Sequence, residues 1–489
     1  MTGQRKDSNQ VVTFGCRLNS YESEAIKLAL KTAQNKNPQL DNLVVFNSCA
    51  VTNEAERQLR QAIRKAAKEN PQAKIVVTGC ASQINPKKYA DMTEVSLVLG
   101  NTNKTDPASY ERLAQNELSN GHDALVAVSM DPATQRGDIG EMVRRDEEGR
   151  ISDGNEYYDK GVLHQDRIFF AQNQFITDDA KILVNDIMSI RETAPHLVSH
   201  FENKTRAFLE IQNGCNHRCT FCIIPYGRGN SRSVPFGRIV EQVKAMIDLG
   251  HKEIVFTGVD ISDYGKDLDV PITLAQMIRR LFKLVPQLPR LRLSSIDVAE
   301  IDDEMLDIIA NESRFMPYLH LSVQSGDDMI LKRMKRRHDR NMILEFCAKA
   351  RQLRSDITFG SDIIAGFPTE TDEMFENSVK LISEAGLIFN HIFPYSKKAG
   401  TPAAKMPQLN GKIIKERAKI LRQAGDLELK KYLKTQIGKT LEVLIEKDGI
   451  GKSKNFFDVQ ISQMINAKIG DIITVTISGA DLEKNILLT

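Results

Sequence analysis

The feature that most constrains this chain is a strand-then-helix alternation, which repeats along two stretches of the sequence. The longer stretch begins near residue 205, and its helical patterns are typified by residues 240–249, 272–284, 341–353 and 372–385. Its strand-like apolar runs lie at residues 208–212, 253–258, 290–296, 318–323, 357–363 and 388–395. Strands that alternate with helices predict a parallel sheet. Six such units predict an open, partial (β/α)6 barrel, with its chemistry in the loops after the carboxyl ends of the strands.

The shorter stretch lies at the N-terminus and predicts a parallel α/β domain. Its strands are expected at residues 11–16, 43–49 and 74–80, with helices at 20–31 and about 52–68. Each strand run ends at a cysteine, namely Cys16, Cys49 or Cys80. Ligands of parallel sheets gather at the carboxyl edge of the strands, so the three thiols are expected to converge there. Each one alone is more typical of a buried core cysteine, and spacing alone does not decide between core and ligand.

A second set of cysteines directly follows the first strand of the predicted barrel. Cys215, Cys219 and Cys222 form a CxxxCxxC triplet within the segment NGCNHRCTFC. A structural zinc ion takes four protein ligands and a cubane iron-sulfur cluster usually takes four cysteines, so three thiolates leave one metal position for another molecule. The alternative is a zinc knuckle with His217 as fourth ligand. His217 is only two residues from Cys215 and from Cys219, which is too close for comfortable chelation.

Composition limits the remaining classes of function. A length of 489 residues predicts about three domains. The net charge of +2 excludes a global basic field, so any RNA binding must be local. Seven cysteines, six of them in the two triplets, favour metal ligation in a reducing compartment over disulfides, and Cys347 is expected in the core of its helix. No secretory or membrane-spanning run is found, which predicts a cytoplasmic protein without a membrane partner.

The CxxxCxxC segment, with the aromatic Phe221 before its last cysteine, resembles the signature loop of the radical S-adenosylmethionine (SAM) enzymes. The resemblance implies a [4Fe-4S] cluster on Cys215, Cys219 and Cys222, whose open iron binds SAM. One electron then cleaves SAM to a 5'-deoxyadenosyl radical. The required electron donor is expected to be a protein such as flavodoxin or ferredoxin.

Two N-terminal segments, TFGCRLNSYESE at 13–24 and NSCAVT at 47–52, resemble the methylthiotransferases of that superfamily. This resemblance implies a second [4Fe-4S] cluster, on Cys16, Cys49 and Cys80, which carries the sulfur to be inserted. It also implies that SAM is used twice, once to methylate that sulfur and once to make the radical. The sequence does not identify the sulfur donor.

The segments GCRLNSYESE at 15–24 and FPYSKKAGTPAA at 393–404 resemble the threonylcarbamoyladenosine branch of the family most closely. That branch implies methylthio transfer to C2 of N6-threonylcarbamoyladenosine in the tRNA anticodon stem-loop. The alternatives are the branches that modify isopentenyladenosine in tRNA or an aspartate of a ribosomal protein. An alternative of another class is a non-catalytic iron-sulfur sensor that binds RNA.

Residues near the strand ends resemble the family's cofactor-binding loops and are expected to contact SAM. The positions are Gly258, Asp260, Ser295, Gln324 and Asp362, together with Phe221 and with Arg336 in the basic run 332–338. Glycine permits close backbone approach, and the polar side chains can hydrogen-bond ribose, adenine or the SAM carboxylate. The alternative for each is a loop or capping residue. No side chain is assigned as a protein acid or base.

The tail changes character after a basic helix at 412–434. Strands expected at 440–446, 456–461, 472–478 and 482–488 predict a small antiparallel β-barrel, which resembles the RNA-binding TRAM module. Lys447, Lys452, Lys454 and the pair Phe456 and Phe457 are candidates for phosphate contact and base stacking, and the alternative is a purely packing domain.

Three domains are expected along the chain. They are an N-terminal α/β domain at 8–118, a radical SAM domain at 201–434 and a TRAM-like domain at 435–489. A linker at 119–200, with a polar insertion at about 130–182, joins the first two.

Overall fold

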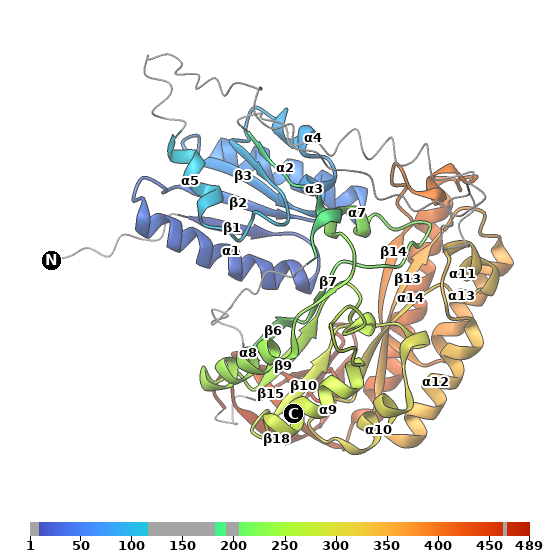
Figure 1. Ribbon diagram of the computed structural model, residues 1–489. Helices are drawn as coiled ribbons and strands as arrows, with labels where there is room; N and C mark the ends of the chain where they lie inside the picture. Colours follow the sequence, from blue (N-terminus) through green and yellow to red (C-terminus); the bar gives the residue numbers. More distant parts are fainter. Residues whose placement is uncertain (1–8, 116–180, 192–204, 463–466) are drawn as a thin grey trace, which may run out of the picture.

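The computed structural model describes residues 9–115, 181–191, 205–462 and 467–489 (Figure 1). The polar insertion expected at 130–182 therefore lies outside the described residues, apart from its last two positions. No helix in the described part of the chain has the length and apolar character needed to cross a membrane.

The N-terminal sheet has five parallel strands in the order β1-β2-β3-β4-β5. They are β1 (Gln10–Thr13), β2 (Leu43–Ser48), β3 (Lys74–Gly79), β4 (Leu97–Leu99) and β5 (Ile182–Leu183). The helices are α1 (Arg17–Lys36), α2 (Asn53–Glu69), α3 (Cys80–Ile84), α4 (Pro86–Ala90) and α5 (Ala108–Gln115). Apolar clusters on both faces of the sheet bury β2 along its whole length. Strand β5 lies in the segment expected to be a linker, so that segment supplies the last strand of this sheet.

The central region contains the six parallel strands that the sequence predicts, and the one expected at 290–296 is divided into two short strands. Strands β6 (Arg206–Glu210), β9 (Glu253–Thr257) and β10 (Arg290–Leu293) form one sheet, and β11 (Ser295–Ile296), β12 (Tyr318–Gln324), β13 (Thr358–Ala365) and β14 (Leu387–Pro394) form the next. Only Ser294 separates β10 from β11, so the two sheets continue into each other as one open, partial barrel.

Helices pack on the outer face of this barrel (Figure 1). They are α8 (Phe236–Asp248), α9 (Leu274–Leu284), α10 (Asp303–Asn311), α12 (Arg340–Leu353) and α13 (Asp372–Glu384). Helix α11 (Asp328–Met334) instead contributes to a separate small apolar cluster that includes Phe367. Alternation along each strand separates the two faces. On β12, Leu319, Leu321 and Val323 join the core under the helices, which leaves Tyr318 and His320 on the inner face. Cys347 is fully buried in that same core, as the sequence predicts.

The C-terminal unit follows the long helix α14 (Gly411–Gln436). Its strands are β15 (Thr440–Lys447), β16 (Ile450–Ser453), β17 (Asp458–Gln460), β18 (Ile472–Thr476), β19 (Gly479–Asp481) and β20 (Ile486–Leu488). They form one sheet in the order β18-β15-β16-β17-β20-β19, in which β17 and β20 are parallel and the other pairs antiparallel. The expectation of a wholly antiparallel unit is therefore corrected at that one pair.

Two aromatic residues that the sequence offered for RNA stacking serve the protein instead. The Phe456 ring stacks on the Tyr318 ring with centroids 4.2 Å apart and an interplanar angle of 8°. The Phe457 side chain is 1% exposed and belongs to the core of the C-terminal sheet. Because Tyr318 begins a barrel strand, Phe456 closes the amino-terminal end of the barrel.

Two of the three lysines that the sequence offered for RNA contact also form ion pairs within the protein. Lys452 is buried and pairs with Asp458 at 2.5 Å, and Lys454 pairs with Glu442 at 3.1 Å. Only Lys447 among the three expected lysines is exposed. Glu442 also joins this unit to the barrel, because it accepts a hydrogen bond from Arg290 at 2.7 Å.

Candidate active site

The N-terminal cysteines lie at the carboxyl edge of neighbouring parallel strands. Cys16 is the N-cap of α1, Cys49 directly follows β2, and Cys80 begins α3 directly after β3. Burial, and then the neighbouring Cys80 and Cys16 thiols, raise the pKa of Cys49 to about 12. Gly15 permits this approach, because it has a φ of 102° and a Cβ there would lie 2.8 Å from the Cys49 Cβ. The three thiols therefore face a common point.

The second cysteine set lies on the loop between the short strand β7 (Gln212–Asn213) and helix α7 (Ile224–Arg228). Burial, and then the neighbouring Cys219, raise the pKa of Cys222 to about 12. Asp260, in the loop after β9, places its Oδ2 3.7 Å from the Cys215 Sγ. The His217 Nε2 lies 3.3 Å from the same carboxylate oxygen, so this imidazole is held by Asp260.

Each cysteine set offers three thiols. A structural zinc ion takes four protein ligands, whereas a cubane cluster held by three cysteines keeps one iron without a protein ligand. His217, the alternative fourth ligand, lies 3.3 Å from the Asp260 carboxylate. The sets of three thiols therefore fit iron-sulfur clusters with one open position.

Arg228 connects the two cysteine sets. It ends helix α7, six residues after Cys222, and its Nε donates to the Cys80 Sγ at 3.2 Å. Its Nη1 donates to the Glu22 carboxylate at 2.8 Å, and its Nη2 to the Asn19 side-chain oxygen at 2.7 Å. Helices α3 and α7 lie side by side where the N-terminal sheet meets the barrel (Figure 1). One buried guanidinium therefore joins the barrel loop to the N-terminal site.

The counter-charge of Arg228 is itself a buried network. Glu22, 3% exposed, also accepts an ion pair from Lys104 at 2.7 Å. Although burial opposes ionisation, Arg228 and Lys104 hold the pKa of Glu22 well below its ordinary value. Burial, and then the nearby Glu22 charge, raise the pKa of Glu210 above its ordinary value. Sequence reasoning missed this network, because its members are spread across separate helices and strands.

Three of the residues expected at the cofactor lie around the barrel loop. Asp260 is beside Cys215, as described above, and the Arg336 Nη1 lies 3.5 Å from the Cys219 Sγ. Phe221 packs edge-on against Phe367, with ring centroids 6.4 Å apart. Asp260 and Arg336 thus contact two of the three cysteines of this loop.

Asp297 is a further residue of this site that sequence reasoning missed. Its Oδ2 accepts a hydrogen bond from the Arg336 Nη2 at 2.7 Å, and its Oδ1 lies 3.2 Å from the His338 Nδ1. Although burial opposes ionisation, His338 and Arg336 hold the pKa of Asp297 far below its ordinary value. Asp297 directly follows strand β11. Polar residues at strand ends are the candidates that the sequence predicts, and including the residue after this strand would have added Asp297 to them.

Three other residues expected at the cofactor lie on barrel strands or directly after one. Ser295 lies on β11, opposite His320 of β12, and Gln324 ends β12 with a φ of 64°. Gly258 is required by its own chain, because a Cβ there would lie 2.5 Å from the Gln212 carbonyl oxygen. Tight packing within the protein is thus one reason for glycine at this position.

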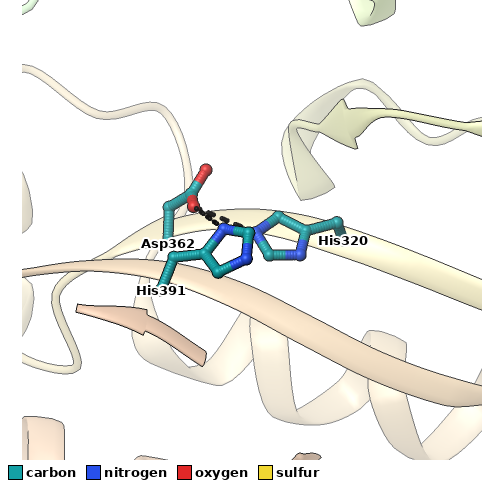
Figure 2. A group of neighbouring side chains, drawn as sticks. All are labelled: His320, Asp362 and His391. Carbon is teal, nitrogen blue, oxygen red and sulfur yellow. Dashed lines mark hydrogen bonds and ion pairs between the residues drawn. The ribbon is translucent and has the colours of Figure 1, made fainter. Parts of the chain in front are cut away.

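Asp362 does not lie at a strand end as the sequence predicted. It lies within β13, between two histidines of the flanking strands (Figure 2). Its Oδ1 is 3.0 Å from the His320 Nε2 and 3.2 Å from the His391 Nδ1. The Tyr318 hydroxyl is 2.8 Å from the remaining nitrogen of His320. Asp362 is thus part of a polar layer on the inner wall of the barrel.

Comparison with known proteins agrees with both cysteine sets. The model of the radical SAM superfamily matches residues 209–382, and that of the uncharacterized protein family UPF0004 matches residues 9–100. The chain is 50% identical to the threonylcarbamoyladenosine tRNA methylthiotransferase MtaB of Rickettsia prowazekii, over 96% of this chain and 95% of that protein. This chain belongs to the radical SAM methylthiotransferase family.

Two more distant relatives carry the two tRNA-modifying names of the family. The MtaB protein of Aquifex aeolicus is 31% identical to this methylthiotransferase, over 92% of this chain and 95% of the relative. The tRNA-2-methylthio-N(6)-dimethylallyladenosine synthase of Roseobacter denitrificans is 29% identical, over 96% of this chain and 95% of that protein. The region matched by UPF0004 contains Cys16, Cys49 and Cys80, and the region matched by the radical SAM superfamily contains the CxxxCxxC loop.

We expect the Arg228→Leu variant of this methylthiotransferase to lose about 3–5 kcal/mol of unfolding free energy, because it leaves the buried Glu22 with one of its two cations. Its iron content should also fall, because the Cys80 sulfur loses its donor. Chemical denaturation and iron analysis measure both effects. The control is Arg238→Leu, whose ion pair with Glu241 has side chains 53% and 60% exposed and should contribute little. Equal losses in the two variants would contradict the role given to Arg228.

Proposed function

We propose that this methylthiotransferase transfers a methylthio group to C2 of N6-threonylcarbamoyladenosine, next to the anticodon of tRNA. The observation that carries the proposal is the pair of three-cysteine sites joined by Arg228, whose Nε contacts the Cys80 Sγ at 3.2 Å. The choice of modified nucleoside is supported by the 50% identity to a relative of that name. The substrate is thus the anticodon stem-loop of a tRNA.

The residues of the two sites fit two [4Fe-4S] clusters and SAM. Cys16, Cys49 and Cys80 would hold one cluster, and Cys215, Cys219 and Cys222 the other. When bound, these groups supply the sulfur and the radical that the reaction needs. The protein holds its two sites close together, and proximity of reacting groups is a large part of catalysis. Arg228 contributes by keeping the carboxyl edge of the N-terminal sheet against the barrel loop.

The proposed SAM contacts are those expected residues that surround the barrel loop. Arg336 is suited to the SAM carboxylate, because Asp297 orients its guanidinium through Nη2 while Nη1 faces Cys219. Asp260 and Phe221 flank the same loop, and Ser295 and Gln324 are proposed for ribose or adenine. Gly258, whose backbone packs against Gln212, and Asp362, which lies within β13 and not at its end, also remain proposed.

Several further assignments belong to the same proposal. The domains are proposed at 8–118, 201–434 and 435–489, with β5 of the intervening segment completing the first sheet. An electron donor such as flavodoxin or ferredoxin is proposed for the reduction of SAM, and the cytoplasm as the location. The C-terminal unit is proposed to contact RNA through its exposed surface, which includes Lys447.

Replacing Asp297 by asparagine should raise the KM for SAM by about tenfold, because Arg336 loses a charge-assisted hydrogen bond, which typically contributes roughly 1.5–3 kcal/mol. The asparagine keeps the shape but loses the charge that pairs with Arg336 and His338. SAM cleavage to 5'-deoxyadenosine, measured across SAM concentrations, gives the KM. Asp303→Asn is a control, because this carboxylate is 99% exposed. An unchanged KM would remove Asp297 from the SAM site.

The function is tested by nucleoside mass spectrometry on tRNA from cells that lack the endogenous activity, with and without this chain expressed. The 2-methylthio form of threonylcarbamoyladenosine should appear only when the chain is present. A methylthio isopentenyladenosine product would instead assign the chain to the sister activity. Purified protein that holds its clusters but makes no 5'-deoxyadenosine would favour a non-catalytic sensor.

A further inference from the structure

Arg17 is a cation at the inner side of the barrel, and no carboxylate among the described residues pairs with it. It is the first residue of α1 and directly follows Cys16. Its guanidinium lies 5.8 Å from the centroid of the Phe456 ring, which closes the amino-terminal end of the barrel. Within the described residues, Arg17 makes no ion pair or side-chain hydrogen bond. A half-buried guanidinium is thus left with its donors unused.

The other cations around the same ring are all neutralised. The charged groups of Arg292 and Lys452 lie 5.1 Å and 4.5 Å from the Phe456 centroid, and that of Arg206 lies 5.8 Å away. Each of the three has an acidic partner, in the pairs Arg292–Glu253, Lys452–Asp458 and Arg206–Glu446. These three cations contact the same Phe456 ring and still have carboxylate partners. Contact with that ring therefore does not explain why Arg17 has none among the described residues.

Asp362, the acidic residue of the inner wall that interacts electrostatically with Arg17, is already hydrogen-bonded to other side chains. Asp362 lies within electrostatic range of Arg17, but its Oδ1 is shared by His320 and His391 (Figure 2). Tyr318 in turn holds His320 at 2.8 Å. Asp362 thus has two hydrogen-bond partners, and no carboxylate among the described residues contacts Arg17.

We propose that Arg17 binds the carboxylate of the threonylcarbamoyl group on the substrate adenosine. This inference rests on the proposed function. The threonyl group ends in a planar anion, which the forked guanidinium can bind through two parallel hydrogen bonds. Arg17 is adjacent to Cys16, so it stands beside the site to which C2 of the adenine must come. The N6 substituent is carried by the same six-membered ring as C2, which brings its carboxylate within reach of a neighbouring side chain.

The same contact explains how a substrate could be selected. An isopentenyl group carries no charge, so an adenosine modified in that way would displace water from Arg17 without replacing its hydrogen bonds. A site built to bind a polar group rejects an analogue that lacks it far more strongly than an apolar pocket rejects a change in size. Arg17 is thus a specificity-determining residue of the substrate site.

The experiment compares two anticodon stem-loops, one with threonylcarbamoyladenosine and one with its methyl ester. With the cluster-loaded wild-type enzyme, the ester should lower kcat/KM for methylthio transfer by on the order of 100-fold and weaken RNA binding measured without reductant. Arg17→Leu should lose a similar factor on the acid and should no longer distinguish acid from ester. Arg17→Lys should recover part of the preference. Arg206→Leu is the matched control, since its guanidinium has its own carboxylate, and it should keep the wild-type ratio.

The outcomes separate this inference from the proposed function. Equal wild-type rates and affinities for acid and ester, or an Arg17→Leu variant with the wild-type preference, would overturn the inference alone. A wild-type enzyme that cleaves SAM but forms no methylthio product from either stem-loop would overturn both. If the Arg17→Leu variant does not fold, two measurements still test the inference. They are the comparison of acid and ester with the wild-type enzyme, and the same comparison with the Arg17→Lys variant.

Discussion

Replacing Cys219 by alanine should abolish SAM cleavage altogether. Cys219 is one of three thiols on the loop between β7 and α7, and the structure offers no nearby fourth cysteine to take its place within the described residues. His217 is held by Asp260 at 3.3 Å and is poorly placed as a substitute. Two thiolates do not retain a cubane cluster with one open position. We expect 5'-deoxyadenosine to fall below detection, by at least about 1000-fold, when it is measured by chromatography after reduction.

The control for this prediction is Cys347→Ala. Cys347 is also buried, but it is a residue of α12 that packs in the apolar core, so its loss removes packing and not a ligand. That variant should keep its iron and its rate of SAM cleavage. Substantial 5'-deoxyadenosine from the Cys219 variant would show that the CxxxCxxC loop does not hold the reactive cluster.

The Cys49→Ala variant should behave differently, with SAM cleavage retained but no methylthio group inserted. Cys49 lies after β2 in the N-terminal sheet, whereas the loop that carries Cys219 belongs to the barrel. Loss of one thiol at the N-terminal site therefore removes sulfur delivery and leaves the barrel loop intact. The yields of 5'-deoxyadenosine and of methylthio nucleoside, measured in one reaction, give the uncoupling.

Normal methylthio product from Cys49→Ala would contradict a second cluster at the N-terminal site. The iron content provides an independent check, because this variant should keep about half of the wild-type iron if each site holds one [4Fe-4S] cluster. A variant that loses nearly all its iron would indicate that the sites depend on each other, and Arg228 is the residue that joins them.

The sequence alone determined the main architecture and the two cysteine sets. Strand and helix periodicity is local, so six barrel strands and the first three N-terminal strands could be placed within a few residues. Cys16, Cys49 and Cys80 follow three such strands, and parallel strands bring their carboxyl ends to one edge. Short strands such as β16 and β19 were missed because three or four residues carry too little periodic signal.

Only the tertiary structure decided which polar side chains face one another. Asp362 was expected at a strand end, but strand register places it between His320 and His391. Phe456 was expected to be a stacking surface for RNA, yet it stacks on Tyr318, 138 positions earlier in the chain. Arg228 contacts Cys80 across 148 positions, and Arg17 contacts Phe456 but pairs with no carboxylate among the residues that the structure describes. Periodicity fixes the face on which a residue lies, but the partner on that face is supplied by a distant segment, and no local pattern specifies it.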